Sequence, residues 1–404
     1  MCRGCGGGTL RSVVDLGLSP PSNALTAPDA LDRAETVFPL HAYVCERCFL
    51  VQVGVAANRE ELFGDYRYFS SYSTTWLAHA QAYAEEMMRR GIGAGSKVVE
   101  VASNDGYLLR NFVARGVSVL GIEPASNVAA VAVASGVPTI DEFFGRALGE
   151  RVRREFGAAD LIAANNVLAH VPDLDDFIGG FAALLAADGV ATFEFPHLLR
   201  TIAGLQFDTI YHEHYSYLSL IALTPRFAAW DLEIVEVGEL PTHGGSLRVF
   251  VAPRGSRPID PSVAAVLAAE HAAGLDRIDT YADFGARVAR AKDDFVRFLI
   301  DAKRRGKRIA GYGAAAKATT LLNYAGVRAD LIPFVADKSP HKQGRFIPGV
   351  RVPIAAPQRI RDERPDYVVI FPWNVEAEIR EELADVRAWG GRFVVAIPEL
   401  RVDA

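Results

Sequence analysis

Short apolar runs alternate with amphipathic stretches in the middle of the chain. The runs are rich in branched and aromatic residues, as buried strands are, and they cover residues 97–102, 117–123, 161–167 and 189–195. The stretches between them place apolar residues at helical spacing. Because strands that are separated by helices pair in parallel, this pattern predicts a doubly wound α/β sheet.

A second alternating series occupies the last part of the chain. Its apolar runs cover residues 307–313, 331–338, 365–372 and 392–399. A segment rich in proline, glycine and serine at 251–262 separates the two series, and a long helical stretch follows it as far as about Arg305. We therefore expect a second α/β unit, with a boundary near residue 250.

The first part of the chain predicts a small unit of its own. Residues 41–54 have the pattern of two strands joined by a turn that carries two cysteines, and residues 76–91 are predicted to form a helix that ends at a glycine. The predicted domains are 1–75, 76–250 and 251–404.

Composition and charge narrow the classes of partner. The 404 residues carry a net charge of −6, so no general attraction to nucleic acid or to an anionic membrane is expected. The N-terminal residues lack the apolar stretch of a secretory signal, and no run of about 18 apolar residues could span a membrane. We expect a cytoplasmic protein in which any anionic substrate binds a local basic pocket. The oligomeric state stays open.

All four cysteines lie in the first 48 residues, as the pairs Cys2/Cys5 and Cys45/Cys48. In a reducing compartment, cysteines are metal ligands more often than they form disulfides. The spacing within each pair lets both thiolates face one ion, and two pairs complete a tetrahedral zinc site with no open position. We predict a structural zinc ion. An iron–sulfur cluster and four unconnected thiols are the alternatives.

A tight turn of small and polar residues follows the first strand of the central unit, and a carboxylate ends the next strand. NAD and S-adenosylmethionine both use this layout, because a carboxylate there can bind ribose hydroxyls. The turn has one glycine, and its carboxylates repel a pyrophosphate but suit a sulfonium cation. We therefore expect S-adenosylmethionine, with an acidic turn that binds no ligand as the alternative. The candidate binding residues are Glu100, Ala102, Ser103, Asn104, Asp105, Gly106 and Glu123.

Polar residues also follow the third strand. Asn165 and Asn166 are expected beside the methyl donor, and His170 beside the substrate. An exposed loop with a solvated histidine is the alternative.

Acid–base groups are dense at residues 207–217, which contain Tyr211, His212, Glu213 and His214. Histidine is the side chain whose ordinary pKa lies nearest neutrality, so the segment is typical of proton transfer. Two alternatives stay open. His212 and His214 would share one face of an extended segment and could bind a metal ion, or the aromatic residues could simply pack.

The C-terminal unit contains a relaxed dinucleotide fingerprint at residues 311–316, followed by Lys317. Taken alone it would suggest NAD. A helix N-terminus beside a lysine suits any diphosphate, including that of a nucleotide sugar. Lys338, Lys342 and Arg345 add a local basic group, for which solvated loop charges are the alternative.

These motifs together resemble the nucleotide-sugar C-methyltransferases of deoxysugar biosynthesis, the family of tetronitrose C-3 methyltransferase. The resemblance covers nearly the whole chain and rests on the cysteine pairs and on residues 68–73, 100–112, 207–217, 242–250, 311–317 and 372–374. One departure is Ala102, where many relatives carry glycine. Alanine should be tolerated there only if its φ is below zero.

The resemblance implies methylation of the carbon alpha to the ketone of a TDP-4-keto-6-deoxysugar, at C-3 in preference to C-5. It implies His214 as the base, with Tyr211 and Glu213 beside it and Tyr66 as a further active-site residue. The C-terminal Rossmann-like unit is expected to hold the nucleotide without NAD. The candidate substrate-binding residues are His170, His243, Lys317, Lys342 and Arg345.

The chemistry is consistent with that implication. A base that removes a proton next to a carbonyl gives an enolate, which can attack the sulfonium methyl group. Donors such as Tyr211 or His212 could stabilise the enolate oxygen. The competing hypotheses are an NAD-dependent nucleotide-sugar oxidoreductase and a non-catalytic zinc-stapled binding module.

Overall fold

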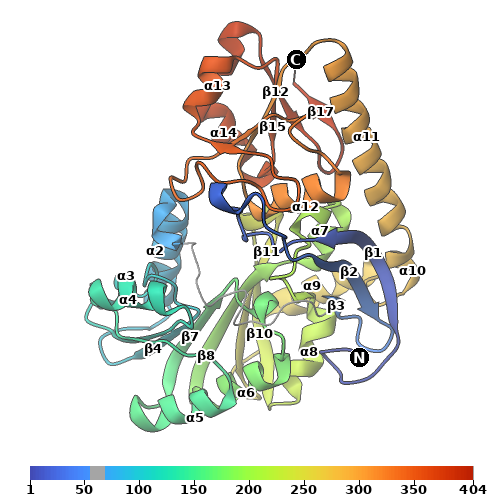
Figure 1. Ribbon diagram of the computed structural model, residues 1–404. Helices are drawn as coiled ribbons and strands as arrows, with labels where there is room; N and C mark the ends of the chain where they lie inside the picture. The colour runs from blue at the N-terminus through green and yellow to red at the C-terminus, as the bar shows by residue number, and fades with distance from the viewer. Residues whose placement is uncertain (55–68, 404) are drawn as a thin grey trace.

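The computed structural model describes residues 1–54 and 69–403, which form three β-sheets (Figure 1). The N-terminal sheet lies at the lower right of Figure 1, the central sheet at the lower left, and the C-terminal sheet at the top. Helix α12 (Ala316–Ala325) lies where the upper unit meets the lower two.

The N-terminal sheet is antiparallel, with the order β1-β2-β3-β9. Its strands are β1 (Leu10–Ser19), β2 (Phe38–Cys45), β3 (Val51–Val53) and β9 (Ser216–Tyr217). Strands β2 and β3 confirm the two strands predicted around the cysteine turn. The fourth strand belongs to the distant 207–217 segment, where Tyr217 pairs with Val51. The cysteine-bearing unit therefore holds part of the histidine-rich segment.

The central sheet has seven strands in the order β10-β11-β8-β7-β4-β5-β6. They are β4 (Lys97–Val101), β5 (Ser118–Ile122), β6 (Thr139–Ile140), β7 (Ala159–Asn165), β8 (Leu185–Pro196), β10 (Leu232–Leu240) and β11 (Ser246–Pro253). The first five strands pair in parallel as predicted, whereas β11 is antiparallel to both β8 and β10. The chain turns to opposite sides of β4 to form β5 and β7, and ligands bind at such a reversal of strand order.

Both faces of this sheet are buried. Val99 and Ile162 belong to one apolar cluster, whereas their neighbours Val98 and Leu161 belong to another. Side chains alternate between the faces of a strand, so the two clusters lie on opposite sides and the doubly wound arrangement is confirmed. The surrounding helices are α2 (Thr74–Arg89), α3 (Arg110–Val113), α4 (Ser126–Ala134), α5 (Arg146–Glu155), α6 (Leu174–Leu184), α7 (Leu198–Ala203) and α8 (Leu220–Ala228).

Helix α2 agrees with the helix predicted at 76–91 and begins where Ser73 accepts a hydrogen bond from the Trp76 amide at 3.2 Å. The helix expected after the turn at residue 106 is shorter than predicted. Three consecutive residues, 107–109, are buried but are not helical. They form turns instead, and α3 begins only at Arg110.

The long helical stretch before residue 305 consists of α9 (Pro261–Ala272), α10 (Asp279–Ala282) and α11 (Phe284–Arg304). Helix α9 packs against β10 and α8 of the central unit. The buried Glu270 of α9 accepts hydrogen bonds from His197 Nε2 at 2.8 Å and from the amides of Leu220 and Ile221 at 2.8 and 2.9 Å. This carboxylate satisfies the first free amides of α8.

The C-terminal sheet has the order β14-β13-β12-β15-β16-β17 and is parallel except for β17. Its strands are β12 (Ile309–Tyr312), β13 (Val335–Ala336), β14 (Ile354–Ala355), β15 (Tyr367–Ile370), β16 (Arg392–Val395) and β17 (Arg401–Val402), with helices α13 (Gln358–Glu363) and α14 (Glu376–Glu382) beside α12. The second α/β series of the sequence is thereby confirmed.

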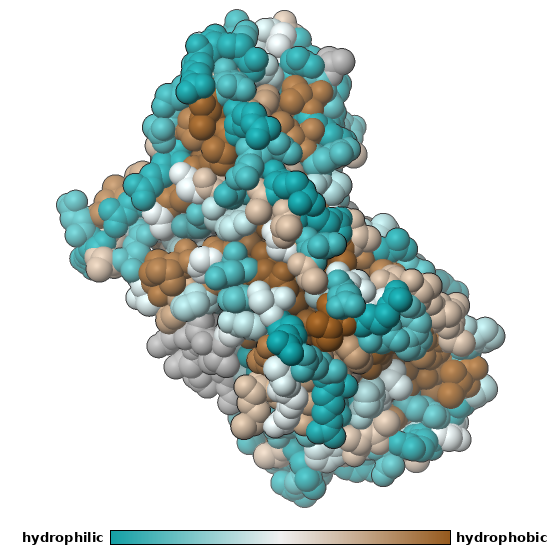
Figure 2. Space-filling model, turned by 90° about the vertical axis from the view of Figure 1, so that its right-hand side faces the viewer, coloured by the Kyte–Doolittle hydropathy of each residue, from teal (hydrophilic) through white to brown (hydrophobic). Residues whose placement is uncertain are grey.

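The face of the molecule in Figure 2 is mostly hydrophilic, and its hydrophobic residues lie in small separate groups on both the upper and the lower part. Among the described residues, no helix is both long and apolar enough to cross a bilayer.

Candidate active site and metal centre

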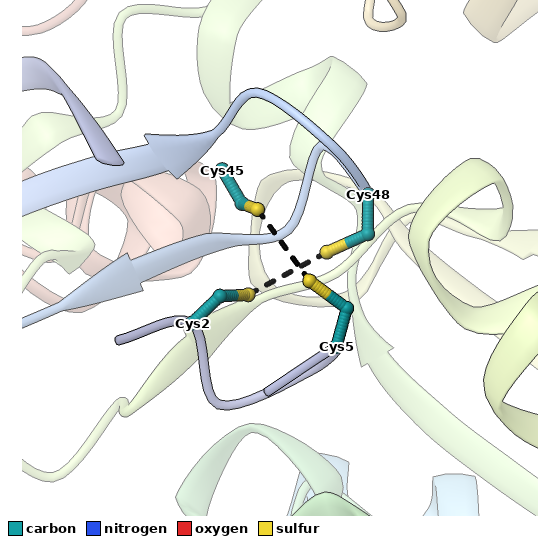
Figure 3. A group of neighbouring side chains, drawn as sticks. All are labelled: Cys2, Cys5, Cys45 and Cys48. Atoms are coloured by element: carbon teal, nitrogen blue, oxygen red, sulfur yellow. Dashed lines mark hydrogen bonds between the residues drawn. The ribbon is translucent and has the colours of Figure 1, made fainter. Parts of the chain in front are cut away.

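The four cysteine side chains converge from two turns (Figure 3). Their sulfur atoms lie within 4.8 Å of one another, with 3.5 Å between Cys2 and Cys48 and 3.7 Å between Cys5 and Cys45. Four sulfurs at about 2.3 Å from a tetrahedral zinc ion are roughly 3.8 Å apart. Gly8 has a φ of +86°, and a Cβ there would lie 2.6 Å from Cys45 Sγ. The four thiolates fit a closed structural zinc site.

A cavity of about 420 Å³ opens between the units. At one end it is lined by Asn104, Glu123 and Asn165, which follow the central strands of the seven-stranded sheet. At the other end it is lined by His214 and Lys317. The cavity therefore joins the predicted donor site to the predicted acid–base segment.

The turn after β4 is held by hydrogen bonds to the end of β5. The Asn104 amide donates to Glu123 Oε2 at 3.0 Å, and the Ala125 amide donates to Glu123 Oε1, also at 3.0 Å. Burial raises the pKa of Glu123, and these two backbone donors oppose the rise. Each carboxylate oxygen keeps a second lone pair that could accept a ligand hydroxyl.

The remaining carboxyl groups of this region lie behind the cavity wall. Glu100 is fully buried, and burial followed by the charges of Glu123 and Asp105 raises its pKa well above the usual value. Asp105 Oδ2 accepts from the Ser71 amide at 3.2 Å. The cavity is not lined by Glu100, Ser103, Asp105 or Gly106, which support the turn from behind it.

The prediction that alanine at position 102 requires a φ below zero is wrong. Its φ is +58°, in the left-handed region, and yet alanine occupies the position. The left-handed conformation costs an alanine roughly 1–2 kcal/mol, because its Cβ approaches the carbonyl oxygen. Asn104 and Asn166 also have positive φ, of +48° and +54°. Both ligand-facing turns of the sheet are therefore strained, as functional turns often are.

Ala102→Gly is expected to stabilise the protein by about 0.5–1 kcal/mol, since relief of the left-handed strain outweighs the added freedom of the unfolded chain. Urea unfolding of both proteins measures the change. Ala130→Gly is the matched control, because the same substitution inside helix α4 should destabilise by about 1 kcal/mol. A destabilised Ala102→Gly protein would contradict the strain assigned to this turn.

Asn165, Asn166 and His170 all line the cavity beyond the end of β7. Asn165 Oδ1 and Asn166 Nδ2 are buried and have no hydrogen-bond partner among the described residues. Buried amide groups without partners are costly, so these atoms are available to a bound ligand.

The ring of His214 is oriented from within its own segment. Its Nδ1 lies 2.9 Å from the carbonyl oxygen of Thr209. A carbonyl oxygen only accepts, so Nδ1 carries the proton and Nε2 is left as an acceptor. Burial, followed by the neighbouring charge of His170, lowers the pKa of His214 well below the usual histidine value. This imidazole is neutral and basic at Nε2 near neutral pH.

The neighbours of His214 include the other candidates. The Tyr211 ring lies 4.0 Å from the His214 ring and the His170 ring lies 4.7 Å away, centroid to centroid. His170 Nδ1 donates to the carbonyl oxygen of Glu213 at 2.8 Å. The Glu213 carboxyl group accepts from Asn23, whose Nδ2 lies 3.2 Å away, and burial raises its pKa. All five residues line the cavity.

His212 lies apart from this group. Its side chain points to the N-terminal sheet, where its ring meets Phe38 edge-on at 5.8 Å, and it does not line the cavity. Residues 211–214 form a turn rather than an extended segment, with the His214 amide donating to the Tyr211 carbonyl oxygen at 3.0 Å, and this turn separates His212 from His214. The shared metal site of these two histidines is therefore wrong. Tyr66 lies outside the described residues.

Of the candidate basic residues, some line the cavity and others do not. Lys317 and His243 line the cavity, as does Lys342, which donates to Asp337 Oδ2 at 3.4 Å. Burial lowers the pKa of Lys317, while the charge of Asp208 opposes this. Arg345 donates to the carbonyl oxygen of His341 and does not line the cavity, so its place beside the substrate stays a prediction.

Sequence reasoning missed Asp208 and Trp373. Asp208 is 1% exposed and accepts from Trp373 Nε1 at 2.8 Å, and the Trp373 ring centroid lies 5.6 Å from Lys317 Nζ. Burial raises the pKa of Asp208 to about 7, and the charge of Lys317 opposes the rise. Both residues lie within motifs that the sequence singled out, but no local signal pairs positions 165 residues apart.

The chain matches family models in three consecutive parts. Residues 2–63 match a zinc binding domain, residues 76–237 a methyltransferase domain, and residues 241–398 a C-methyltransferase C-terminal domain.

Among individual proteins, the C-methyltransferase NovU of Streptomyces niveus is 37% identical over 403 residues, which cover 99% of this chain and 96% of that protein. Two solved structures show a more distant likeness. Magnesium protoporphyrin IX methyltransferase from Synechocystis, with bound SAH, is 13% identical over 48% of this chain and 91% of that chain, with a TM-score of 0.34. A SAM-dependent methyltransferase from Anabaena variabilis is 13% identical over 46% of this chain and 93% of that chain, with a TM-score of 0.35.

Proposed function

This chain belongs to the C-methyltransferase family and is an S-adenosylmethionine-dependent enzyme, and from that premise we propose that it methylates the carbon alpha to the ketone of a TDP-4-keto-6-deoxysugar. C-3 is the proposed position. One observation carries the proposal: a single cavity is lined by Glu123 of the predicted donor site, by His214 and its neighbours, and by Lys317 and Lys342.

The donor end suits an adenosine that carries a sulfonium group. Glu123 would accept hydrogen bonds from the ribose hydroxyls, and the unpartnered amide atoms of Asn165 and Asn166 would bond polar groups of the donor. A bound sulfonium or ammonium charge would favour the ionised form of the buried Glu100 carboxyl group, which lies behind the cavity wall. S-adenosylmethionine supplies the electrophilic methyl group when it is bound.

His214 Nε2 is the proposed base. It takes the proton from the carbon next to the ketone, and the electron pair of that C–H bond becomes an enolate. The enolate carbon then forms a bond to the methyl carbon while the bond from sulfur to that carbon breaks, which leaves S-adenosylhomocysteine. The low pKa of His214 keeps the imidazole unprotonated before the substrate binds. Tyr211 is the proposed donor to the enolate oxygen, and Glu213 and His170 fix the segment around it.

The nucleotide diphosphate is proposed to lie at the N-terminus of α12. Lys317 and the backbone of Ala315 and Ala316 line the cavity there, and Lys342 approaches from the next loop. Free amides at a helix start and nearby ammonium groups attract phosphate. We propose three functional parts on this basis: zinc-binding 1–75, donor-binding 76–250 and nucleotide-binding 251–404.

The test incubates the protein with S-adenosylmethionine and TDP-4-keto-6-deoxysugars, and measures product masses. A gain of one CH₂ that depends on the donor supports the proposal, and loss of deuterium from C-3 rather than C-5 assigns the position. The matched control is the corresponding 4-hydroxy sugar, which cannot form the enolate and should gain no mass. Nicotinamide reduction on addition of NAD, without methyl transfer, would instead support an oxidoreductase.

Glu123→Gln is expected to weaken S-adenosylmethionine binding by about 1.5–3 kcal/mol, roughly tenfold to a hundredfold, because a hydrogen bond to a charged acceptor is lost. Binding of TDP should stay nearly unchanged. Calorimetric titration measures both affinities, and Asp141→Asn, an exposed carboxylate that does not line the cavity, is the control. Equal loss of both affinities would make Glu123 a structural residue.

A further inference from the structure

The zinc-binding turn and the catalytic segment lie on neighbouring strands. Strand β3 begins three residues after Cys48, and it pairs with β9, which begins two residues after His214. The Val53 amide donates to the carbonyl oxygen of Tyr215 at 3.2 Å. The metal centre is thus one strand away from the proposed base.

Arg3 connects these two features directly. It lies between the zinc ligands Cys2 and Cys5, and its amide donates to Gln52 Oε1 at 3.0 Å. Its guanidinium Nη2 donates to the carbonyl oxygen of Val53 at 2.9 Å and also to that of Tyr215, the residue directly after His214. The guanidinium carbon lies 5.4 Å from the Tyr215 ring centroid. One side chain from the metal-binding turn therefore holds both strands at the catalytic segment.

We infer that Arg3 is a positioning residue for catalysis: it transmits the order of the zinc site to the backbone beside His214. The inference rests on the proposed role of His214 as base. On the N-terminal side of His214, the Thr209 carbonyl oxygen fixes the His214 ring, and the His214 amide donates to the Tyr211 carbonyl oxygen at 3.0 Å. With Arg3 in place, the segment is fixed both before and after His214. The zinc-binding unit then serves turnover as well as stability.

A second arginine offers the matched control. Arg226 of α8 donates from Nη1 to the carbonyl oxygen of Gly4, in the same metal-binding turn. It connects the turn to α8, and among the described residues it forms no hydrogen bond or ion pair with residues 207–217. Arg226→Met therefore removes a contact to the zinc turn without touching the catalytic segment.

The experiment compares full-length Arg3→Met and Arg226→Met. Zinc content, kcat, the KM for S-adenosylmethionine and amide hydrogen exchange of residues 207–217 are measured. Arg3→Met should keep one zinc ion and the wild-type KM for the donor, while kcat falls about tenfold, because misplacement of a reacting group costs rate rather than binding. Its 207–217 amides should exchange faster. Arg226→Met should match wild type in zinc content, kcat, KM and hydrogen exchange. Arg3→Lys should recover part of the kcat that Arg3→Met loses.

Wild-type kcat and exchange in Arg3→Met would overturn the inference, as would an equal loss of kcat in Arg226→Met. If Arg3→Met loses zinc, the comparison passes to zinc-loaded Arg3→Lys, whose exchange at 207–217 must exceed that of wild type. The exchange readout does not depend on the role of His214. A fully active His214 variant would remove the proposed base but leave faster exchange in Arg3→Met intact, so the two failures can be told apart.

Discussion

His214→Asn is expected to lower kcat by about 10²-fold or more, because asparagine keeps polarity and approximate size but cannot accept the alpha proton. Affinities for S-adenosylmethionine and for TDP should stay near wild type, since Nε2 is assigned to proton transfer and not to binding. Steady-state kinetics and calorimetry on the same samples separate the two effects.

Solvent exchange gives a finer test of the same assignment. Where solvent reaches the base, wild-type protein should exchange the alpha proton of the ketosugar in deuterated water without the methyl donor, and His214→Asn should not. His212→Asn is the control from the neighbouring position. Its ring packs against Phe38 outside the cavity, so its effect on kcat should be much smaller. An essential His212 with a dispensable His214 would reverse the two roles.

The pH dependence of kcat should follow from the low pKa of His214. The neutral imidazole is the active form, and turnover is lost as pH falls through the pKa of the base. Burial lowers that pKa well below the ordinary value, so the acid limb of the kcat profile should lie below the pH at which a solvated histidine loses activity. A limb centred near the ordinary histidine pKa would show that the base is solvated or is another group.

Cys45→Ser is expected to abolish zinc binding and to unfold the N-terminal sheet. A structural zinc site supplies an apparent 10–16 kcal/mol or so of folding free energy, comparable to the roughly 5–15 kcal/mol net stability of a whole domain. The zinc content measured by elemental analysis should fall from about one ion per chain to nearly none, and the solubility of the protein should also fall. Turnover should be lost too, because β9 would have no partner strand.

Glu46→Gln is the control in the same turn. Glu46 lies between Cys45 and Cys48, and its carboxylate forms an ion pair with the exposed Arg11, and surface pairs of this kind contribute little. This variant should retain zinc and stability. A metal-free protein that stays folded and active would contradict the structural zinc site.

Local chemistry made part of the site predictable. The cysteine pairs, the turn after the first central strand and the density of acid–base groups at 207–217 are all short-range patterns. These patterns depend only on a strand that precedes the turn and on two cysteine pairs that come together in the fold. The sequence could not distinguish His212 from His214, because an extended segment would place both on one face, whereas the turn at residues 211–214 directs only His214 to the cavity. Lys342 and Arg345 were likewise equivalent until the loop path placed one in the cavity.

The sequence by itself determined the order of the three units, the two α/β series and the residue types that can bind zinc and a sulfonium donor, because these depend on periodicity and on spacing along the chain. The tertiary structure decided which groups meet: Asp208 with Trp373, His170 with the Glu213 carbonyl, and Arg3 with the backbone after His214. Such pairs join residues tens to hundreds of positions apart. Their meeting depends on how sheets pack and on which side chains burial then forces to find partners, and no local pattern encodes that.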